Sequence, residues 1–333
     1  MSRDHLRHDP SPQPRYVQLV QSIFWLLSTA LLAATLSAEP HWYKGNTHTH
    51  TLESDGDSSP ADVVRWYREH GYDFLVITDH DKDTEIHDDK LLLIPGEEVT
   101  DRFAKKPLHV NAIGLTKPVA PLHGDSIVST LQHDVDAVRE AGGIAEINHP
   151  NFGWAFGAGE MKQVNGFTLL EIASGHPLVN MKGGGGVESV EEMWDDLLRA
   201  GKRVFAAGVD DAHHFHGETK VGELAPPGKA WIVVRAEKLD QKEIVGAISR
   251  GDFYASTGVA LDAIETDGKS MTVRIHENLG AKFRTSFVTD KGESVVVANP
   301  ATYTFRGGEM FVRARVDDSN GHSAWTQPVF LKK

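Results

Sequence analysis

The sequence predicts an α/β protein with a smaller all-β part at its C-terminal end, and two observations support this. Between about residues 42 and 254, short β-branched runs alternate with longer amphipathic stretches, which is typical of repeated βα units. After Tyr254 only short alternating runs follow, separated by turn dipeptides such as Asp267-Gly268 and Asn320-Gly321. The 333 residues are 40% hydrophobic and 24% charged, as in folded globular proteins.

The helices are predicted from their ends as well as from their periodicity. Ser59 and Pro60 supply a capping hydroxyl and a first-turn proline. Gly71, Gly142 and Gly201 each follow a helical stretch and precede a strand, an order that belongs to parallel α/β architecture. The expected helices are 59–70, 126–141, 189–200 and 240–250. The expected strands are 73–78, 90–95, 108–114, 143–148, 168–173 and 203–208, and then 271–276, 284–289, 293–298, 309–317 and 323–331.

The N-terminus has the layout of a secretory signal peptide. Arg3, Arg7 and Arg15 precede an apolar run at 23–36, and Ser37-Ala38 offers a small-residue cleavage site. We therefore expect a signal peptide at 1–38 and a periplasmic or secreted protein, with no stable membrane insertion after cleavage. An uncleaved anchor over residues 17–36 is the alternative. The remaining chain divides into an α/β domain at 39–255 and an all-β module at 256–333.

Composition excludes several classes of function. The chain has no cysteine, so any metal site must use nitrogen and oxygen ligands. Its net charge is −13 and no basic run is longer than Lys105-Lys106, which argues against nucleic-acid binding. A small-molecule substrate fits better, and the partner of the β module stays open.

Histidine and acidic residues recur in short clusters through the middle of the chain, mostly where a predicted strand enters a loop. Imidazole and carboxylate groups bind Zn²⁺, Mn²⁺ and Fe²⁺, and strand ends are where barrel folds assemble their sites. His48 and His50 are two apart on an extended segment and so point the same way. The pattern indicates a multinuclear metallohydrolase. The clusters are His48-Thr49-His50, Thr78-Asp79-His80, Gly96-Glu97-Glu98, Asn148-His149-Pro150 and Asp211-Ala212-His213.

Taken in order, with His109-Val110-Asn111 between the third and fourth clusters, these motifs resemble the PHP family, named for polymerase-associated and histidinol-phosphatase domains. The resemblance covers about residues 42–255, and the signal peptide and β module look similar to the secreted carbaryl-hydrolase-like branch. It implies a distorted (β/α)7 barrel of PHP type, a TIM-like barrel with two or three divalent ions (Mn, Zn or Fe) at the strand ends.

The resemblance also implies which residues hold each ion. His48, His50, Glu97 and Asp211 would hold the first, and Glu97, His109 and His149 the second, so that Glu97 bridges them. Asp55, His80 and His213 would hold the third. Many relatives have histidine in place of Asp55, so occupancy of this site is open. We expect Asp79 to cap or orient a loop and Glu98 to hydrogen-bond behind the ligands.

The function implied is that of a metal-dependent phosphoesterase, in which a metal-bridging hydroxide at Glu97 and Asp211 attacks a small phosphate ester. His176 or His214 would protonate the leaving group. Cationic partners for the phosphate are expected among Arg102, Lys105, Lys106 and Lys182. Two alternatives are an amide, carbamate or carboxyl-ester hydrolase and a non-catalytic, metal-containing binding protein of the cell envelope, although a structural site would need fewer ligands.

Overall fold

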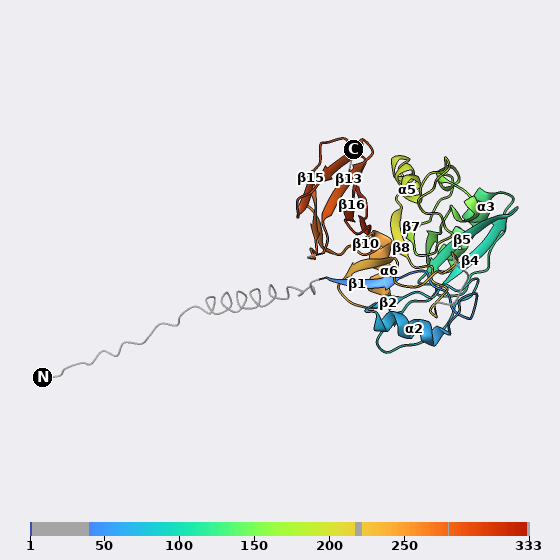
Figure 1. Ribbon diagram of the computed structural model, residues 1–333. Helices are drawn as coiled ribbons and strands as arrows, with labels where there is room; N and C mark the ends of the chain where they lie inside the picture. Colours follow the sequence, from blue (N-terminus) through green and yellow to red (C-terminus); the bar gives the residue numbers. More distant parts are fainter. Residues whose placement is uncertain (2–39, 217–221, 279, 332–333) are drawn as a thin grey trace. The chain divides into compact units, whose positions relative to one another are not determined.

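A computed structural model describes residue 1 and residues 40–216, 222–278 and 280–331 of the chain (Figure 1). The part that begins at Pro40 forms one compact unit. The predicted signal peptide lies outside the described residues. Among those described, no helix combines the length and the apolar character needed to cross a membrane.

The larger sheet is mixed and runs through both predicted domains. Its order is β14-β13-β16-β17-β10-β9-β1-β2-β3, and β18 pairs with β16. β1, β2 and β3 are parallel, whereas β9 and β10 pair antiparallel with their neighbours. The strands are β1 (His41–Asn46), β2 (Phe74–Leu75), β3 (Leu92–Leu93), β9 (Trp231–Ala236), β10 (Phe253–Ser256), β13 (Phe283–Thr289), β14 (Gly292–Val296), β16 (Phe311–Asp318), β17 (Ser323–Thr326) and β18 (Val329–Phe330).

The second sheet has five strands in chain order. β4 (Gly96–Phe103), β5 (Lys106–Ile113) and β6 (Ile144–Ile147) are antiparallel, and β6, β7 (Leu169–Ser174) and β8 (Phe205–Val209) are parallel. The expectation of parallel βα units is therefore wrong for β4 and β5, which form a hairpin. A third sheet of three strands, in the order β11-β12-β15, consists of β11 (Leu261–Thr266), β12 (Ser270–Ile275) and β15 (Ala301–Thr304).

The helices lie where the sequence predicts them. They are α2 (Pro60–Glu69), α3 (Ile127–Glu140), α5 (Val190–Arg199) and α6 (Gln241–Arg250), with the short α4 (Ala158–Met161) and the 3₁₀ turn η1 (Phe152–Trp154) between them. Ser59, Ser126, Ser189 and Asp240 cap the four long helices through backbone N–H groups of the first turn. α3 packs on β4, β5 and β6, α5 on β7, and α6 on β9.

One apolar cluster joins the two larger sheets, since Ile113 of β5 and Leu169 of β7 pack with Ile232 and Val234 of β9. Two isolated bridges, Thr49 with Ala212 and His80 with Glu98, also tie the sheets together. The described strands nevertheless fall into separate ladders, so the structure establishes a mixed α/β fold and does not show a (β/α)7 barrel.

The C-terminal strands share a sheet with the strands before residue 255. β10 pairs directly with β17, so the larger sheet continues across the predicted boundary. Charged contacts add to this junction, because buried Arg313 of β16 donates to Asp195 Oδ1 (2.7 Å) and Glu191 Oε1 (2.9 Å) of α5. Its guanidinium also lies over the Trp194 ring, 4.6 Å from the ring centre.

Candidate metal centre

Backbone hydrogen bonds fix the loop that carries the first histidine pair. His50 N–H donates to Ala212 O and Asp211 N–H donates to His48 O, both at 2.9 Å, which ties the segment after β1 to the segment after β8. Asp211 adopts a left-handed conformation with φ of 48°, which is uncommon outside glycine and is often found at functional sites. The first cluster and the last are therefore neighbours in space.

The β4–β5 hairpin delivers a carboxylate and an imidazole from adjacent positions. Glu98 pairs with Asn111 in register, and the next pair on that face is Thr100 with His109. Because side chains alternate along a strand, Glu98 and His109 lie on one face of the hairpin and Glu97 on the other. His109 Nδ1 lies 2.9 Å from Glu98 Oε1.

This alternation overturns the expectation for Glu97. Its side chain is buried on the far side of β4, where Oε1 accepts a hydrogen bond from Val119 N. Burial raises the pKa of Glu97 to about 7, and Asp83 and Asp81 add to this rise. Glu98, which we expected behind the ligands, takes the central place. Val99, whose side chain is buried in the core that packs on α3, shares a face with Glu97 and is the sequence signal for this orientation.

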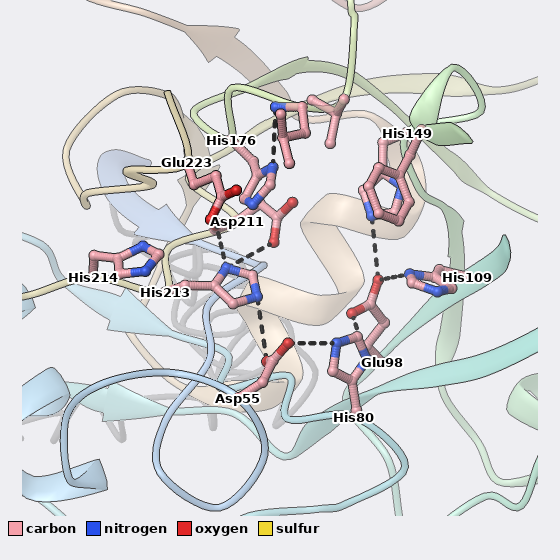
Figure 2. A pocket seen from close by; sticks show the side chains of 13 residues that line it. Asp55, His80, Glu98, His109, His149, His176, Asp211, His213, His214 and Glu223 are labelled. Carbon is pink, nitrogen blue, oxygen red and sulfur yellow. Dashed lines mark hydrogen bonds and ion pairs between the residues drawn. The ribbon is translucent and has the colours of Figure 1, made fainter. Parts of the chain in front are cut away.

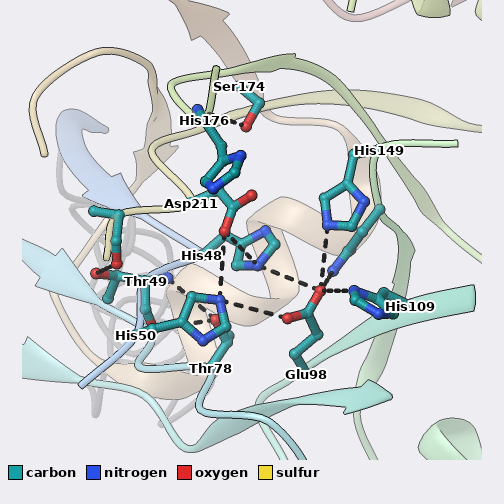
Figure 3. Close-up of polar contacts among 12 residues, drawn as sticks. His48, Thr49, His50, Thr78, Glu98, His109, His149, Ser174, His176 and Asp211 are labelled. Carbon is teal, nitrogen blue, oxygen red and sulfur yellow. Dashed lines mark hydrogen bonds and ion pairs between the residues drawn. The ribbon is translucent and has the colours of Figure 1, made fainter. Parts of the chain in front are cut away.

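Four overlapping groups of side chains could each hold a metal ion, since the ligand atoms within each group lie within 4.8 Å of one another (Figures 2 and 3). With Glu98 in place of Glu97, every residue expected as a ligand belongs to at least one group. The groups are His48, Glu98 and His149; His48, His50 and Asp211; His80, Glu98 and His109; and His50, Asp55, His80 and His213.

Glu98 belongs to two of these groups and lies beside histidines of the other two. Its Oε1 lies 3.3 Å from His149 Nε2 and 3.5 Å from His48 Nε2, and its Oε2 lies 3.4 Å from His50 Nε2. Asn148 donates to the same Oε1 at 2.8 Å. Only 1% of Glu98 is exposed, so this carboxylate is accessible only from within the centre.

Asp55 completes the outermost group from a loop. Its carboxylate lies 3.3 Å from His213 Nε2 and 3.5 Å from His80 Nε2. Asp79 holds this loop in place, because its two oxygens accept from Thr51 N–H and from three hydroxyl groups. The prediction that Asp79 orients a loop is confirmed. Asp210 accepts from three backbone N–H groups and from the Tyr67 hydroxyl, and so anchors the chain beside Asp211.

Glu171 of β7 is a site residue that the sequence analysis missed. Its Oε2 accepts from His48 Nδ1 at 3.0 Å, and both side chains are fully buried. This contact fixes the Nδ1–H tautomer and leaves the Nε2 lone pair free to bind a metal. A carboxylate within the apolar run Leu169-Leu170-Glu171-Ile172 was the available signal.

The ionisable groups strongly perturb one another. Burial opposes the charged form of Glu98, yet His109 and His48 hold its pKa well below the usual range. Burial and the neighbouring His213 lower the pKa of His50 to about 4. Burial also opposes the charged form of His80, but Asp55 and Glu98 raise its pKa to about 9. Such opposed shifts in one cleft are typical of functional sites.

A cavity of about 310 Å³ opens above the centre (Figure 2). His176 and His214 line it, as expected, and so do the apolar side chains of Phe152, Leu178 and Val179. None of the four expected phosphate partners is among the described lining residues. Lys106 donates to Trp154 O, Lys182 lines other cavities, and Arg102 and Lys105 are exposed.

Comparisons with known proteins give structural similarity only. No family model and no curated protein matches the chain. A two-domain protein from Bacteroides vulgatus, which contains a predicted PHP-like metal-dependent phosphoesterase, has 17% identity and a TM-score of 0.49, covering 84% of this chain and 90% of its own.

Two further solved structures cover less of the chain. An amidohydrolase from Chromobacterium violaceum with bound sulfate has 17% identity and a TM-score of 0.36, over 55% of this chain and 92% of its own. A candidate metal-dependent phosphoesterase from Bifidobacterium adolescentis has 16% identity and a TM-score of 0.37, over 57% of this chain and 94% of its own. Similarity at this level identifies no family, so the function is argued from the site.

Proposed function

We propose that this protein is a metal-dependent hydrolase of PHP type that cleaves a small-molecule phosphate ester. The observation that carries the proposal is the convergence of four overlapping ligand groups beneath an open cavity. A structural metal site is closed by four ligands, whereas overlapping groups beside a cavity leave positions for water and substrate.

The buried atoms of the centre fit metal ions. His48 Nε2 and His50 Nε2 are buried and have no hydrogen-bond partner among the described residues. Both face Asp211 Oδ1, at 3.3 and 3.4 Å. A lone pair that faces a carboxylate oxygen is repelled unless a proton or a cation lies between them, and an unpartnered buried polar atom is costly. A shared cation removes both penalties.

Divalent ions bound here would lower the pKa of a coordinated water to about 7 and neutralise the oxygens of a phosphoryl group. The protein's own residues position and shield the reaction. Glu98 on β4 and Asp211 just after β8 would hold the ions from the two edge strands of the five-stranded sheet, and Glu171 keeps His48 in the metal-binding tautomer. Phe152, Leu178 and Val179 provide an apolar wall for the organic part of the ester.

One observation favours a second candidate, an amide, carbamate or carboxyl-ester hydrolase. The described lining of the cavity has no lysine or arginine to pair with a phosphate dianion. A carbonyl substrate brings no such charge, and the same metal chemistry serves both reactions. Substrate class is therefore the first property to test.

The test compares three substrates and two adjacent glutamates. The protein is loaded with Mn²⁺ or Zn²⁺, its metal content is measured, and hydrolysis of p-nitrophenyl phosphate, bis-p-nitrophenyl phosphate and p-nitrophenyl acetate is followed. We expect phosphate-ester hydrolysis that falls by roughly 10³-fold or more in Glu98→Gln, together with reduced metal content. Glu97→Gln is the matched control and should retain both.

Other outcomes are equally informative. Hydrolysis of the acetate alone, with the same dependence on Glu98, would establish the acyl hydrolase. Equal loss in both glutamate variants would contradict the assignment of Glu98, and no hydrolysis by the metal-loaded wild type would overturn the proposed function.

We also propose three features that follow from the resemblance. The two larger sheets would represent a distorted (β/α)7 barrel, supported by their shared apolar cluster and the two bridges. The ions would be Mn, Zn or Fe, given a ligand set of nitrogen and oxygen. Export through a signal peptide at residues 1–38, as in a secreted carbaryl-hydrolase-like branch, is supported by the sequence pattern.

A further inference from the structure

Two histidines line the cavity without belonging to any of the four ligand groups. His176 follows β7 and His214 follows β8. Figures 2 and 3 both show the His176 ring beside the Asp211 carboxylate, and its centre lies 5.2 Å from that of His213. Their role can be argued from the hydrogen bonds that hold each ring.

The backbone decides which nitrogen of each ring carries the proton. Leu178 N–H donates to His176 Nδ1 at 3.3 Å, and Ala225 N–H donates to His214 Nδ1 at 3.1 Å. A backbone amide can only donate, so in both rings Nδ1 must offer its lone pair. In a neutral imidazole the proton then lies on Nε2, which becomes a hydrogen-bond donor.

Two of the ligand histidines, His48 and His213, show the opposite arrangement. His48 Nδ1 faces the Glu171 carboxylate at 3.0 Å, and His213 Nδ1 faces the Asp211 carbonyl at 3.0 Å. Both partners can only accept, so Nδ1 carries the proton and the Nε2 lone pair is free for a metal. These four imidazoles thus divide into two lone-pair ligands and two N–H donors.

We propose that His176 and His214 are neutral Nε2–H donors that bind an oxygen atom of the substrate beside the metal centre. This inference rests on the proposed function for the identity of the bound molecule, an ester whose phosphoryl or carbonyl oxygen accepts the hydrogen bond. Fixed donors aimed at a developing oxyanion stabilise the transition state, and a neutral imidazole can serve as such a donor.

This role differs from the acid role expected from the sequence. An imidazolium donates from both nitrogens, so protonating either ring would set Nδ1–H against a backbone N–H and break the contact that holds the ring. The two rings would also supply hydrogen-bond donors for a substrate oxygen, a role that lysine or arginine often fills and that none fills among the described lining residues.

The first test reads the tautomer directly by NMR. The protein is labelled with ¹⁵N-histidine, and the ring signals of His176 and His214 are assigned by their loss in His176→Gln and His214→Gln. We expect a protonated Nε2 and an unprotonated Nδ1 in both rings near neutral pH, with and without Zn²⁺. An Nδ1–H tautomer or an imidazolium in either ring would overturn the proposal.

The second test separates a donor from an acid. The glutamine amide can donate near the position of Nε2 but cannot deliver a proton, whereas alanine offers no donor. For whichever ester the wild type hydrolyses, we expect His176→Ala to lower kcat/KM by roughly 10²-fold and His176→Gln by tenfold or less, with metal content unchanged in both. Equal losses, or loss of metal, would overturn the donor role.

The two tests also separate this inference from the function on which it rests. If the wild type hydrolyses none of the three esters, the proposed function fails, and the NMR signals still decide the tautomers. If esters are hydrolysed and the tautomers are reversed, the function stands and the donor assignment fails.

Discussion

The metal centre and the junction between α5 and β16 both bury ionisable side chains, but these side chains have different partners in the two regions. At the junction, Arg313 meets two carboxylates, and Arg315 reaches Glu191 Oε2 at 3.2 Å. At the centre, imidazoles crowd one another, and the His50 and His213 rings stack with centres 4.1 Å apart. At the junction each carboxylate meets a guanidinium, whereas at the centre several imidazole nitrogens converge on shared carboxylates, as expected of metal ligands, and we propose a structural role for the first region and a functional role for the second.

Removing metal is the largest perturbation that this comparison predicts. Ions that bind only the folded state stabilise it, by about 4 kcal/mol for each site at a free metal concentration of 1,000 times Kd. We therefore expect chelation to lower Tm by several degrees or more in calorimetry, and readdition of Mn²⁺ or Zn²⁺ to restore it. The metal-dependent gain should shrink in Glu98→Gln. A Tm that does not change with metal would contradict this comparison, because the centre would then, like the junction, be stable without added cations.

Breaking the junction should have the next largest effect. Arg313→Met leaves Glu191 and Asp195 without their buried partner, and loss of one member of a buried ion pair costs about 3–5 kcal/mol. Denaturant unfolding would measure this loss, and metal content should not change. Arg315→Met is the matched control. Arg315 is 32% exposed in its side chain, so its loss should cost about 1 kcal/mol or less.

Glu171 connects the centre to the strands behind it. Glu171→Gln weakens the charged hydrogen bond to His48 Nδ1, and loss of such a partner typically costs 10- to 100-fold in metal affinity. Competition with a chromophoric chelator would measure it. Glu146→Gln tests the specificity of the effect, because burial raises the pKa of Glu146 well above its usual range and the change removes no charge. Equal weakening in both variants would count against a specific role for Glu171.

Asp134 of α3 represents a third case, a buried carboxylate that forms no ion pair with any described residue and belongs to none of the four ligand groups. Burial raises its pKa to about 7, and Oδ1 accepts from Leu122 N. The folded state therefore favours the protonated form, and the stability that this group contributes is lost as pH rises from about 4 to 7. Asp134→Asn should match wild type near pH 4 and exceed it by about 1–3 kcal/mol above pH 7, in urea titrations at several pH values. A difference independent of pH would refute the raised pKa.

Local signals predicted the helices and most strands, because capping residues and periodicity depend on neighbours in the chain. The four long helices are confirmed to within a residue or two. β4 was missed because its Glu-Glu and Thr-Asp-Arg residues resemble a loop, and its strand form depends on pairing with β5. β1, β9, β10, β11 and β15 were not predicted either. All but β11, which pairs with the adjacent β12, have partners distant in sequence.

The candidate ligands were predictable as a set but not in every position. Spacing paired His48 with His50, the family resemblance added His109 and Asp211, and the structure places all four in the overlapping ligand groups. The choice between Glu97 and Glu98 depends on which face of β4 packs on α3, and a shift of one residue reverses it. Ring tautomers depend on backbone groups such as Ala225 N–H, which no sequence pattern specifies.

The pairing of β10 with β17 has a consequence for biosynthesis. Residues 253–256 leave the ribosome well before residues 323–326, so the edge of β10 stays open until β17 has been synthesised. An open strand edge can pair with other chains, and pairing between segments so distant in sequence closes slowly. A chain truncated after residue 255 would keep that edge permanently, so we expect it to aggregate rather than to yield an isolated catalytic domain.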